Sequence, residues 1–532
     1  MIYFIPAWYQ NDQWSENEQY WYRRRTKTEF DDTVKQIQLF HRSRVHPFQI
    51  MVLNYAPNLR HFLHRQSAFR APYWSCFDAI QEIKRKKVKM FSFHNLNWPE
   101  NIEFIYSPFA LVAMLHGEKY ATVEFAEDGN LIQVDIYQKE LLCRKNIYDD
   151  RGFVSSTIVY EQGVPLYQDY LTDNGVWKIR HYLNDGHVDV NPKNNRYLLT
   201  YGEEEYVKEF LKASYDSLEQ VITEVFEAYV SLTYENDIYC VAVHELHNSL
   251  MHKVLQKHKM ILSFFEDRFD IKNKTKKIHP MLSQAAYIIT DTKDNLIRIR
   301  QQMKRPLENI TDITPFDSRV DLGISQQLTV QKILVPVDDL EPERFEEIVV
   351  CLGSYLVGNE NARVHLFSRT ADPGIKRQLL EKTRDALMKA GMEPEWARED
   401  TKNQIGENLL EGEDYVPVRF IVEQCVDELA VSKCVREQRL IVDMRKNSEL
   451  YLKIMGISMG IPQIVYRDNQ FVEDGNNGMV VKNSAMLADA VSYYLDDLKN
   501  WNAAMISAYE LSKKYTTGVL TDKWKEVIKF VG

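Results

Sequence analysis

The chain has 532 residues, too many for a single hydrophobic core, so two to four domains are expected. Its hydrophobic fraction of 45% and charged fraction of 27% are typical of a packed globular protein and argue against extended disorder. The net charge of −10 argues against a dedicated nucleic-acid binder, whose affinity depends on neutralising phosphates. Six cysteines without a C-x-x-C spacing exclude a disulfide framework and favour a reduced cytoplasmic protein.

The longest apolar runs, at residues 104–115 and 348–357, are shorter than the ~20 residues that span a bilayer. The apolar opening, residues 1–9, has no basic residue before it, since the first basic residue is Arg23. We therefore expect neither a membrane span nor an N-terminal export signal.

Residues 1–118 alternate short apolar runs with helical patterns. Residues 2–7 and 48–53 are predicted strands, and Phe30-Asp31-Asp32-Thr33 opens a predicted amphipathic helix. This alternation is typical of a parallel sheet covered by helices, and it predicts the first part of a Rossmann-like lobe.

From residue 119 the hydrophobic period changes to two. Turn pairs such as Arg151-Gly152 and Asp185-Gly186 separate runs of alternating apolar and polar residues. Residues 119–202 are therefore predicted to form an antiparallel meander inserted into the first lobe. The α/β pattern resumes over residues 203–320, beginning with a predicted helix at 206–214 and ending in a polar, proline-interrupted linker.

A second Rossmann-like lobe is predicted over residues 321–513, with strands at 332–337, 362–367, 439–442 and 463–466. Residues 514–532 are predicted to form a helix that returns to the first lobe. Two such lobes joined by one linker fit the α/β GT-B fold of glycosyltransferases. In such sheets a ligand binds at the carboxyl ends of the strands, here between the lobes.

The most specific local pattern lies in the second lobe. There Gly460-Ile461-Pro462 follows a short predicted helix, and a G-x-x-G segment spans residues 475–481. This order resembles the donor lobe of retaining GT-B transferases. Glycine at such points lets the backbone approach a ligand or another backbone, so tight packing alone is the alternative explanation.

The residues that those transferases use on a sugar nucleotide are not in register here. Aligned on Gly460, their E-x7-E glutamate pair falls on Asn447 and Met455, and a thioether cannot replace a carboxylate. Glu449 lies close, but moving the register by two residues would lose the G-x-P match.

The diphosphate side of the pocket is also altered. The Arg and Lys expected after the first strand of this lobe are replaced by Asp338 and Asp339, which would repel a diphosphate. Alternatively, both are turn and N-cap residues without a ligand. We interpret the pocket as a degenerate donor site with no catalytic residue, cofactor or metal.

Three further patterns have two interpretations each. His244-Glu245-Leu246-His247 differs from the metal motif H-E-x-x-H; it either forms a helical histidine stripe with His252 and His258 or, as we interpret it, is ordinary helix sequence. Lys84, Arg85, Lys86 and Lys87 form either a solvated helix end or a contact with anionic lipid. The aromatic opening belongs either to the core or to a partner or substrate surface; its members are Trp8, Tyr9, Trp14, Trp21 and Tyr22.

Several segments together resemble the family of the first accessory secretory protein of the bacterial accessory Sec system. They include the predicted meander, residues 456–463 and the motifs Phe4-Ile5-Pro6-Ala7-Trp8-Tyr9, Tyr20-Trp21-Tyr22, Phe30-Asp31-Asp32-Thr33-Val34 and Ser448-Glu449-Leu450-Tyr451. The resemblance implies a cytoplasmic protein with a GT-B fold, an inserted β-sheet domain and lost transferase activity.

The same resemblance implies a role in exporting a glycosylated serine-rich repeat adhesin. The implied partners are the second and third accessory secretory proteins, the accessory motor ATPase and the adhesin itself, and the basic run would add a peripheral contact with the anionic inner face of the membrane. The competing hypotheses are an active retaining glycosyltransferase that uses a UDP-sugar, and a lectin.

Overall fold

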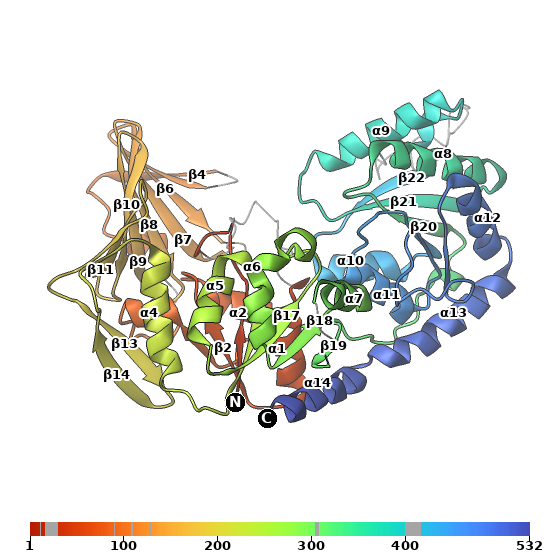
Figure 1. Ribbon diagram of the computed structural model, residues 1–532. Helices are drawn as coiled ribbons and strands as arrows, with labels where there is room; N and C mark the ends of the chain where they lie inside the picture. The colour runs from red at the N-terminus through yellow and green to blue at the C-terminus, as the bar shows by residue number, and fades with distance from the viewer. Residues whose placement is uncertain are drawn as a thin grey trace.

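The computed structural model describes residues 1–10, 12–15, 30–89, 91–107, 110–126, 129–303, 308–399 and 417–532. Two lobes with parallel sheets lie side by side, and a long antiparallel sheet stands on the far side of the first lobe (Figure 1). This arrangement confirms the predicted α/β fold of two Rossmann-like lobes with an inserted antiparallel sheet.

The first lobe is built around a seven-stranded parallel sheet of order β19-β18-β17-β16-β1-β2-β3. Its central strands are buried along their whole length, as expected for a sheet covered by helices on both faces. The strands are β1 (Ile2–Ile5), β2 (Phe48–Val52), β3 (Tyr73–Ser75), β16 (Ile238–Ala242), β17 (Lys259–Phe264), β18 (Tyr287–Thr290) and β19 (Ile310–Asp312). The helices are α1 (Asp32–Ser43), α2 (Leu59–Arg65), α3 (Cys76–Ile80), α4 (Leu218–Val230), α5 (Glu245–Val254), α6 (Ile271–Gln284) and α7 (Lys293–Gln302).

The chain leaves this lobe after β3 to form a ten-stranded sheet of order β15-β12-β11-β10-β9-β8-β7-β6-β5-β4. The strands are β4 (Ile102–Tyr106), β5 (Leu111–Leu115), β6 (Glu118–Phe125), β7 (Leu131–Gln138), β8 (Leu141–Asp149), β9 (Phe153–Glu161), β10 (Val164–Leu171), β11 (Trp177–Tyr182), β12 (Val188–Val190) and β15 (Ser214–Tyr215). Because β4 and β5 precede residue 119 and β15 follows residue 202, we propose wider limits, 102–215, for the inserted part.

The predicted helix at residues 206–214 is wrong. This segment contains strand β14 (Glu204–Glu209), which forms a separate hairpin with β13 (Arg196–Tyr201). Gly202 makes the turn with a positive φ of 64°, and Val207 then lies opposite Leu198. Cross-strand pairing therefore outweighs the helix propensity of a glutamate-rich run.

The second lobe contains a six-stranded parallel sheet of order β22-β21-β20-β23-β24-β25. Its strands are β20 (Gln331–Pro336), β21 (Ala362–Ser368), β22 (Phe420–Gln424), β23 (Leu440–Asp443), β24 (Gln463–Val465) and β25 (Gly478–Val480). Its helices are α8 (Pro342–Gly358), α9 (Ile375–Lys389), α10 (Glu428–Arg436), α11 (Leu450–Met459), α12 (Ser484–Leu495) and α13 (Leu498–Ser512). Short 3-10 turns are η2 (Phe93–Asn95), η3 (Ser325–Gln327), η4 (Pro394–Trp396) and η6 (Lys513–Tyr515).

The last helix, α14 (Thr517–Val531), runs back beneath the first lobe (Figure 1). Trp524 is buried there, with its ring 5.0 Å from that of Phe40 and 6.2 Å from that of Phe4. The end of the chain thus packs on the first strand and first helix and ties the two lobes together. Among the described residues, no helix combines the length and the apolar character that a bilayer span needs.

Candidate functional site

A cavity of about 850 Å³ lies between the lobes. Its wall is made chiefly by the segments that follow the carboxyl ends of parallel strands in both sheets, where α/β folds bind ligands. The first lobe contributes Trp8 and Tyr9 after β1, Phe265 to Arg268 after β17 and Asp291 after β18; the second contributes Asp338 and Asp339 after β20, Arg369 after β21, Arg445 to Glu449 after β23 and Arg467 after β24.

Asp338 has a structural role at this wall. Its carboxylate accepts hydrogen bonds from Ser368 Oγ and from the Arg369 backbone nitrogen, each at 2.6 Å. It therefore joins the loops after β20 and β21. Asp338 and Asp339 lie in a turn, as the alternative interpretation expected, and Asp339 has a positive φ of 61°. The N-cap part of that interpretation is wrong, because Glu341 occupies the N-cap position of α8.

Asn447, Met455 and Gly460, the other residues of the predicted donor pocket, occupy different environments. Asn447 lines the cavity, whereas Met455 packs against the apolar cluster of the second lobe. Gly460 ends α11 with φ of 68°, and a Cβ at this position would lie 2.8 Å from the Met505 side chain. This glycine is therefore required by helix termination and packing, which is the alternative that the sequence left open.

A glutamate does reach the cavity, six residues before Met455. Glu449 begins α11, and its carboxylate lies 3.5 Å from Arg369 Nε. The Arg369 guanidinium is buried and stacks on the Phe30 ring, with its carbon 4.0 Å from the ring centroid. Glu449 is thus held by a cation of its own lobe, which in turn contacts the first lobe.

Two more arginines of the wall have carboxylate partners. Arg445 makes a bidentate pair with Asp443, at 2.9 and 2.8 Å. Arg268 Nη1 donates to Asp32 at 2.5 Å and to Asp31 at 3.3 Å. These cations are already neutralised by the protein, and such pairs are strong because they are largely removed from water.

Lys453 differs from these arginines. It lines the cavity from α11, and within the described part of the chain no hydrogen bond or ion pair reaches its ammonium group. Burial lowers the pKa of Lys453. The nearby carboxylates of Asp443 and Asp294 partly offset this decrease. It is a candidate contact for an anion that enters the cavity.

Sequence reasoning missed Arg268, Arg369, Arg445 and Lys453. A usable signal existed for two of them, because Arg445 follows predicted strand 439–442 and Arg369 follows predicted strand 362–367. Polar residues directly after parallel strands belong to the ligand-binding edge of the sheet. For Lys453 no such local signal exists, since it lies within a helix.

Direct contacts between the lobes border the cavity. The ring of Tyr451 lies 4.8 Å from that of Phe30 and 5.1 Å from that of Phe316, which belongs to the linker. Lys35 Nζ donates to Glu428 Oε2 at 2.6 Å, which joins α1 to α10. The cavity therefore has a fixed apolar border on one side.

The aromatic opening of the chain is largely packed. Trp8 is buried and its indole donates to Asp31 at 3.0 Å. The Tyr9 hydroxyl and His247 Nδ1 share a hydrogen bond of 2.7 Å, and Trp14 meets the Tyr9 ring edge-on. Trp8 and Tyr9 also line the cavity. Trp21 and Tyr22 lie outside the described residues.

The histidines of the 244–247 motif are built into the fold. His244 caps α5 by accepting from the Leu246 backbone nitrogen, and His247 Nε2 lies 2.7 Å from the Ala242 carbonyl oxygen. Burial lowers the pKa of His247 to about 3, so its imidazole is neutral. These contacts agree with the interpretation as helix residues.

The basic run divides into two kinds of side chain. Lys84, Lys86 and Lys87 are exposed, whereas Arg85 donates to the carbonyl oxygens of Arg151 and Gly152 at 3.2 and 3.1 Å. Only the three lysines are therefore available to a partner or a surface.

Two parallel-sheet lobes around a cavity at their strand ends, with a returning C-terminal helix, define a protein of the GT-B class. A family model described as an accessory Sec system protein, the first of the accessory secretory proteins, matches residues 1–531. A curated relative with that description from Streptococcus gordonii is 33% identical over 536 residues, 99% of each chain. One from Staphylococcus aureus is 30% identical over 535 residues, with the same 99% coverage. The chain belongs to this family and is a component of the accessory Sec system.

Solved structures agree with this assignment. A chain of the Glycosylation Associate Protein (Gap123) complex from Streptococcus agalactiae matches with a TM-score of 0.79 at 31% identity, covering 98% of this chain and 99% of that one. A chain of the crystal structure of accessory secretory protein 1, 2 and 3 in Streptococcus pneumoniae matches with a TM-score of 0.81 at 27% identity, covering 100% and 99%. The pneumococcal O-GlcNAc transferase GtfA matches with a TM-score of 0.70 over 100% and 98% of the two chains at 10% identity, which confirms the GT-B fold alone.

The aspartate pair at the cavity predicts a pH dependence of stability. Burial, together with the neighbouring Asp32 carboxylate, raises the pKa of Asp31 to about 6, against its ordinary value of 3.8. A raised folded-state pKa means that the folded chain binds this proton more tightly than the unfolded chain. The resulting stability is present below about pH 4 and is lost as pH rises through about 6.

In Asp31→Asn we expect the melting temperature to fall less between pH 4 and 7 than it does in the wild type. The corresponding difference in the free energy of unfolding is on the order of 2 kcal/mol. Asparagine caps a helix as well as aspartate does, so α1 is preserved. Asp522→Asn, at an exposed position on α14, is the control and should keep the wild-type slope. Equal slopes in Asp31→Asn and the wild type would contradict the prediction.

Proposed function

We propose that this accessory Sec component acts without enzymatic turnover, as a binding protein with a degenerate glycosyltransferase fold. The main support is that three arginines of the cavity wall are neutralised by the protein's own carboxylates. The pairs are Arg369 with Glu449, Arg445 with Asp443, and Arg268 with Asp31 and Asp32. A diphosphate that entered would have to displace a carboxylate from a buried cation, which costs several kcal/mol.

The second candidate is a retaining glycosyltransferase that uses a UDP-sugar. Two observations favour it: Glu449 lies in the cavity, and the Lys453 ammonium group faces the same space. The positions aligned with the transferase glutamate pair oppose it, because Asn447 offers no carboxylate and Met455 packs in an apolar cluster.

A thermal-shift experiment separates the two candidates. A ligand at 100 times its dissociation constant stabilises a fold by ~2.7 kcal/mol, which is readily measured. We expect no change in melting temperature with UDP, UDP-glucose or UDP-N-acetylglucosamine, and no release of UDP. A saturable shift that disappears in Lys453→Met, together with UDP release, would establish the enzyme.

We further propose that the chain acts in complex with the second and third accessory secretory proteins, and with the accessory motor ATPase and the glycosylated serine-rich repeat adhesin as further partners. One similar solved structure is the Glycosylation Associate Protein (Gap123) complex, and another contains accessory secretory protein 1, 2 and 3. The inserted sheet is our candidate contact surface, because its edge strand β4 leaves Ile105 and Tyr106 exposed by 54% and 70%. An exposed apolar edge strand is a common site for another chain to pair.

This contact is tested by co-purification of the tagged chain with both sister proteins and the motor ATPase, using glycosylated and bare adhesin as bait. We expect the double variant Ile105→Ser, Tyr106→Ser to lose at least one partner. The control is Val357→Ser, which removes an equally exposed apolar side chain from α8. Retention of every partner by the double variant would exclude this edge as the contact.

Lys84, Lys86 and Lys87 are our candidates for a peripheral contact of this cytoplasmic protein with the inner face of the membrane. Each exposed lysine near an anionic surface contributes about 1 kcal/mol. We expect the triple Lys→Glu variant to lose flotation with phosphatidylglycerol vesicles at low salt. A triple variant that floats like the wild type would remove this contact from the proposal.

A further inference from the structure

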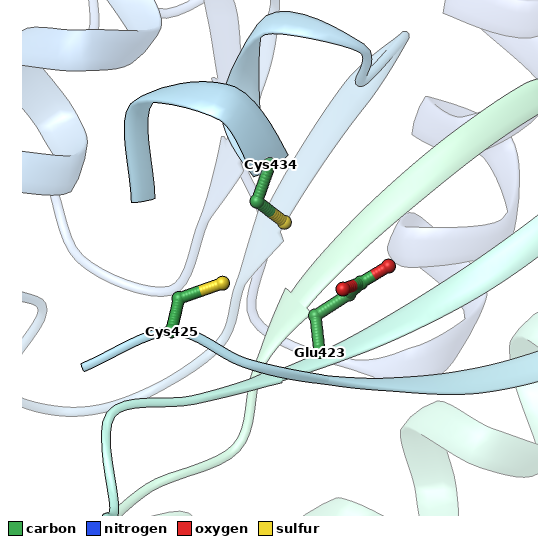
Figure 2. A group of neighbouring side chains, drawn as sticks. All are labelled: Glu423, Cys425 and Cys434. Carbon is green, nitrogen blue, oxygen red and sulfur yellow. The ribbon is translucent and has the colours of Figure 1, made fainter. Parts of the chain in front are cut away.

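A second group of reactive side chains lies in the outer part of the second lobe. Glu423 belongs to edge strand β22, Cys425 follows this strand, and Cys434 lies on α10 (Figure 2). The two sulfur atoms point into the same space with the Glu423 carboxylate beside it, and the three ligand atoms lie within 4.8 Å of one another. None of these residues lines the interlobe cavity.

The backbone presents these side chains in a defined way. Glu423 and Cys425 are two positions apart, so they share one face of the extended chain. The Cys425 backbone nitrogen donates to the Ser368 carbonyl oxygen at 2.9 Å, and its own carbonyl accepts from Arg369 Nη1 at 3.1 Å. Cys434 is placed by α10, whose start is capped by the Asp427 side chain. The group is therefore held by a strand and a helix.

The spacing fits one tetrahedral ion. Two thiolates bound to the same zinc ion lie about 3.8 Å apart, because each Zn–S bond is about 2.3 Å long. The observed upper limit of 4.8 Å can be closed by a sub-ångström adjustment of the side chains. Calcium and magnesium are excluded by chemistry, since both require oxygen ligands and two of these three ligands are sulfur.

Neighbouring polar groups support the same interpretation. His365, on β21 and almost fully buried, has Nδ1 2.9 Å from Glu423 Oε1. Gln438 Nε2 lies 2.8 Å from the Cys434 carbonyl oxygen and 3.9 Å from its sulfur. Metal-binding carboxylates and thiolates are commonly oriented by such hydrogen bonds from a surrounding layer of residues.

We propose that Glu423, Cys425 and Cys434 bind one zinc ion, with water as the fourth ligand. Binding takes the proton from each thiol that is not already ionised and releases it to solvent, while the oxidation state of sulfur and zinc is unchanged. The ion links α10 to β22, which within the described ranges of the chain has a neighbouring strand on one side only. Its role is therefore to hold the outer edge of this lobe.

The test uses the full chain, purified under reducing conditions, stripped with a chelator and titrated with Zn²⁺ or Co²⁺. We expect one Zn²⁺ per chain, a higher melting temperature, and with Co²⁺ a thiolate-to-metal charge-transfer band that Zn²⁺ abolishes. Cys425→Ser and Cys434→Ser should each weaken binding at least tenfold, and Glu423→Gln should weaken it less. Cys351→Ser is the control, because this thiol lies on α8 of the same lobe and donates to the Ser484 carbonyl oxygen.

Serine variants that unfold would leave the metal result open, so thiol alkylation of the wild-type chain provides a second measurement. We expect Zn²⁺ to protect Cys425 and Cys434 from alkylation and to leave Cys351 unchanged. The proposal is overturned by the absence of stoichiometric metal in the reduced chain, by equal binding in the cysteine variants and the wild type, or by alkylation of Cys425 and Cys434 that Zn²⁺ does not slow.

Discussion

The contact on which the interlobe site depends is the stack of Phe30, from the first lobe, on the Arg369 guanidinium of the second, 4.0 Å apart. Arg369 is buried, and a buried cation needs an anionic partner, to which an aromatic face adds further stabilisation. Glu449 supplies the anion and Phe30 supplies the face. The same contact extends through Tyr451 to Phe316, so the linker and both lobes meet at one point.

This constraint explains the chemistry of the cavity. Two parallel sheets face each other with their carboxyl ends, where polar loop residues gather, and any charge there is partly removed from water. The protein satisfies its arginines with its own carboxylates, as Asp443 does for Arg445 and Asp32 does for Arg268. Because these arginines already have carboxylate partners, the cavity is better suited to a protein-binding scaffold than to a site for a sugar nucleotide. Among the described residues, Lys453 and Arg467 line the cavity without a carboxylate partner, and any remaining anion affinity would arise from them.

Much of the fold follows from local patterns. The alternation of buried strands and amphipathic helices predicted both Rossmann-like lobes, and the Asp31 cap of α1 is visible in the Phe30-Asp31-Asp32-Thr33 motif. The helix predicted at 206–214 failed because its strand character comes from pairing with β13, which the local propensity does not contain. Strand β22 and helix α10 were missed, since both are short and a long polar stretch precedes them in the sequence.

The sequence by itself determined the class of fold, from residue types at short spacing, and the family, from its resemblance to known members. Only the tertiary structure decided which charges neutralise each other at the cavity wall and which cysteines approach each other. Arg369 meets Glu449 and Phe30 through the path of the chain around two sheets. Cys425 meets Cys434 because the short connection after β22 brings α10 back beside the end of this strand. Ion pairs and metal ligands act over a few ångströms of space, whereas sequence patterns report only on neighbours along the chain.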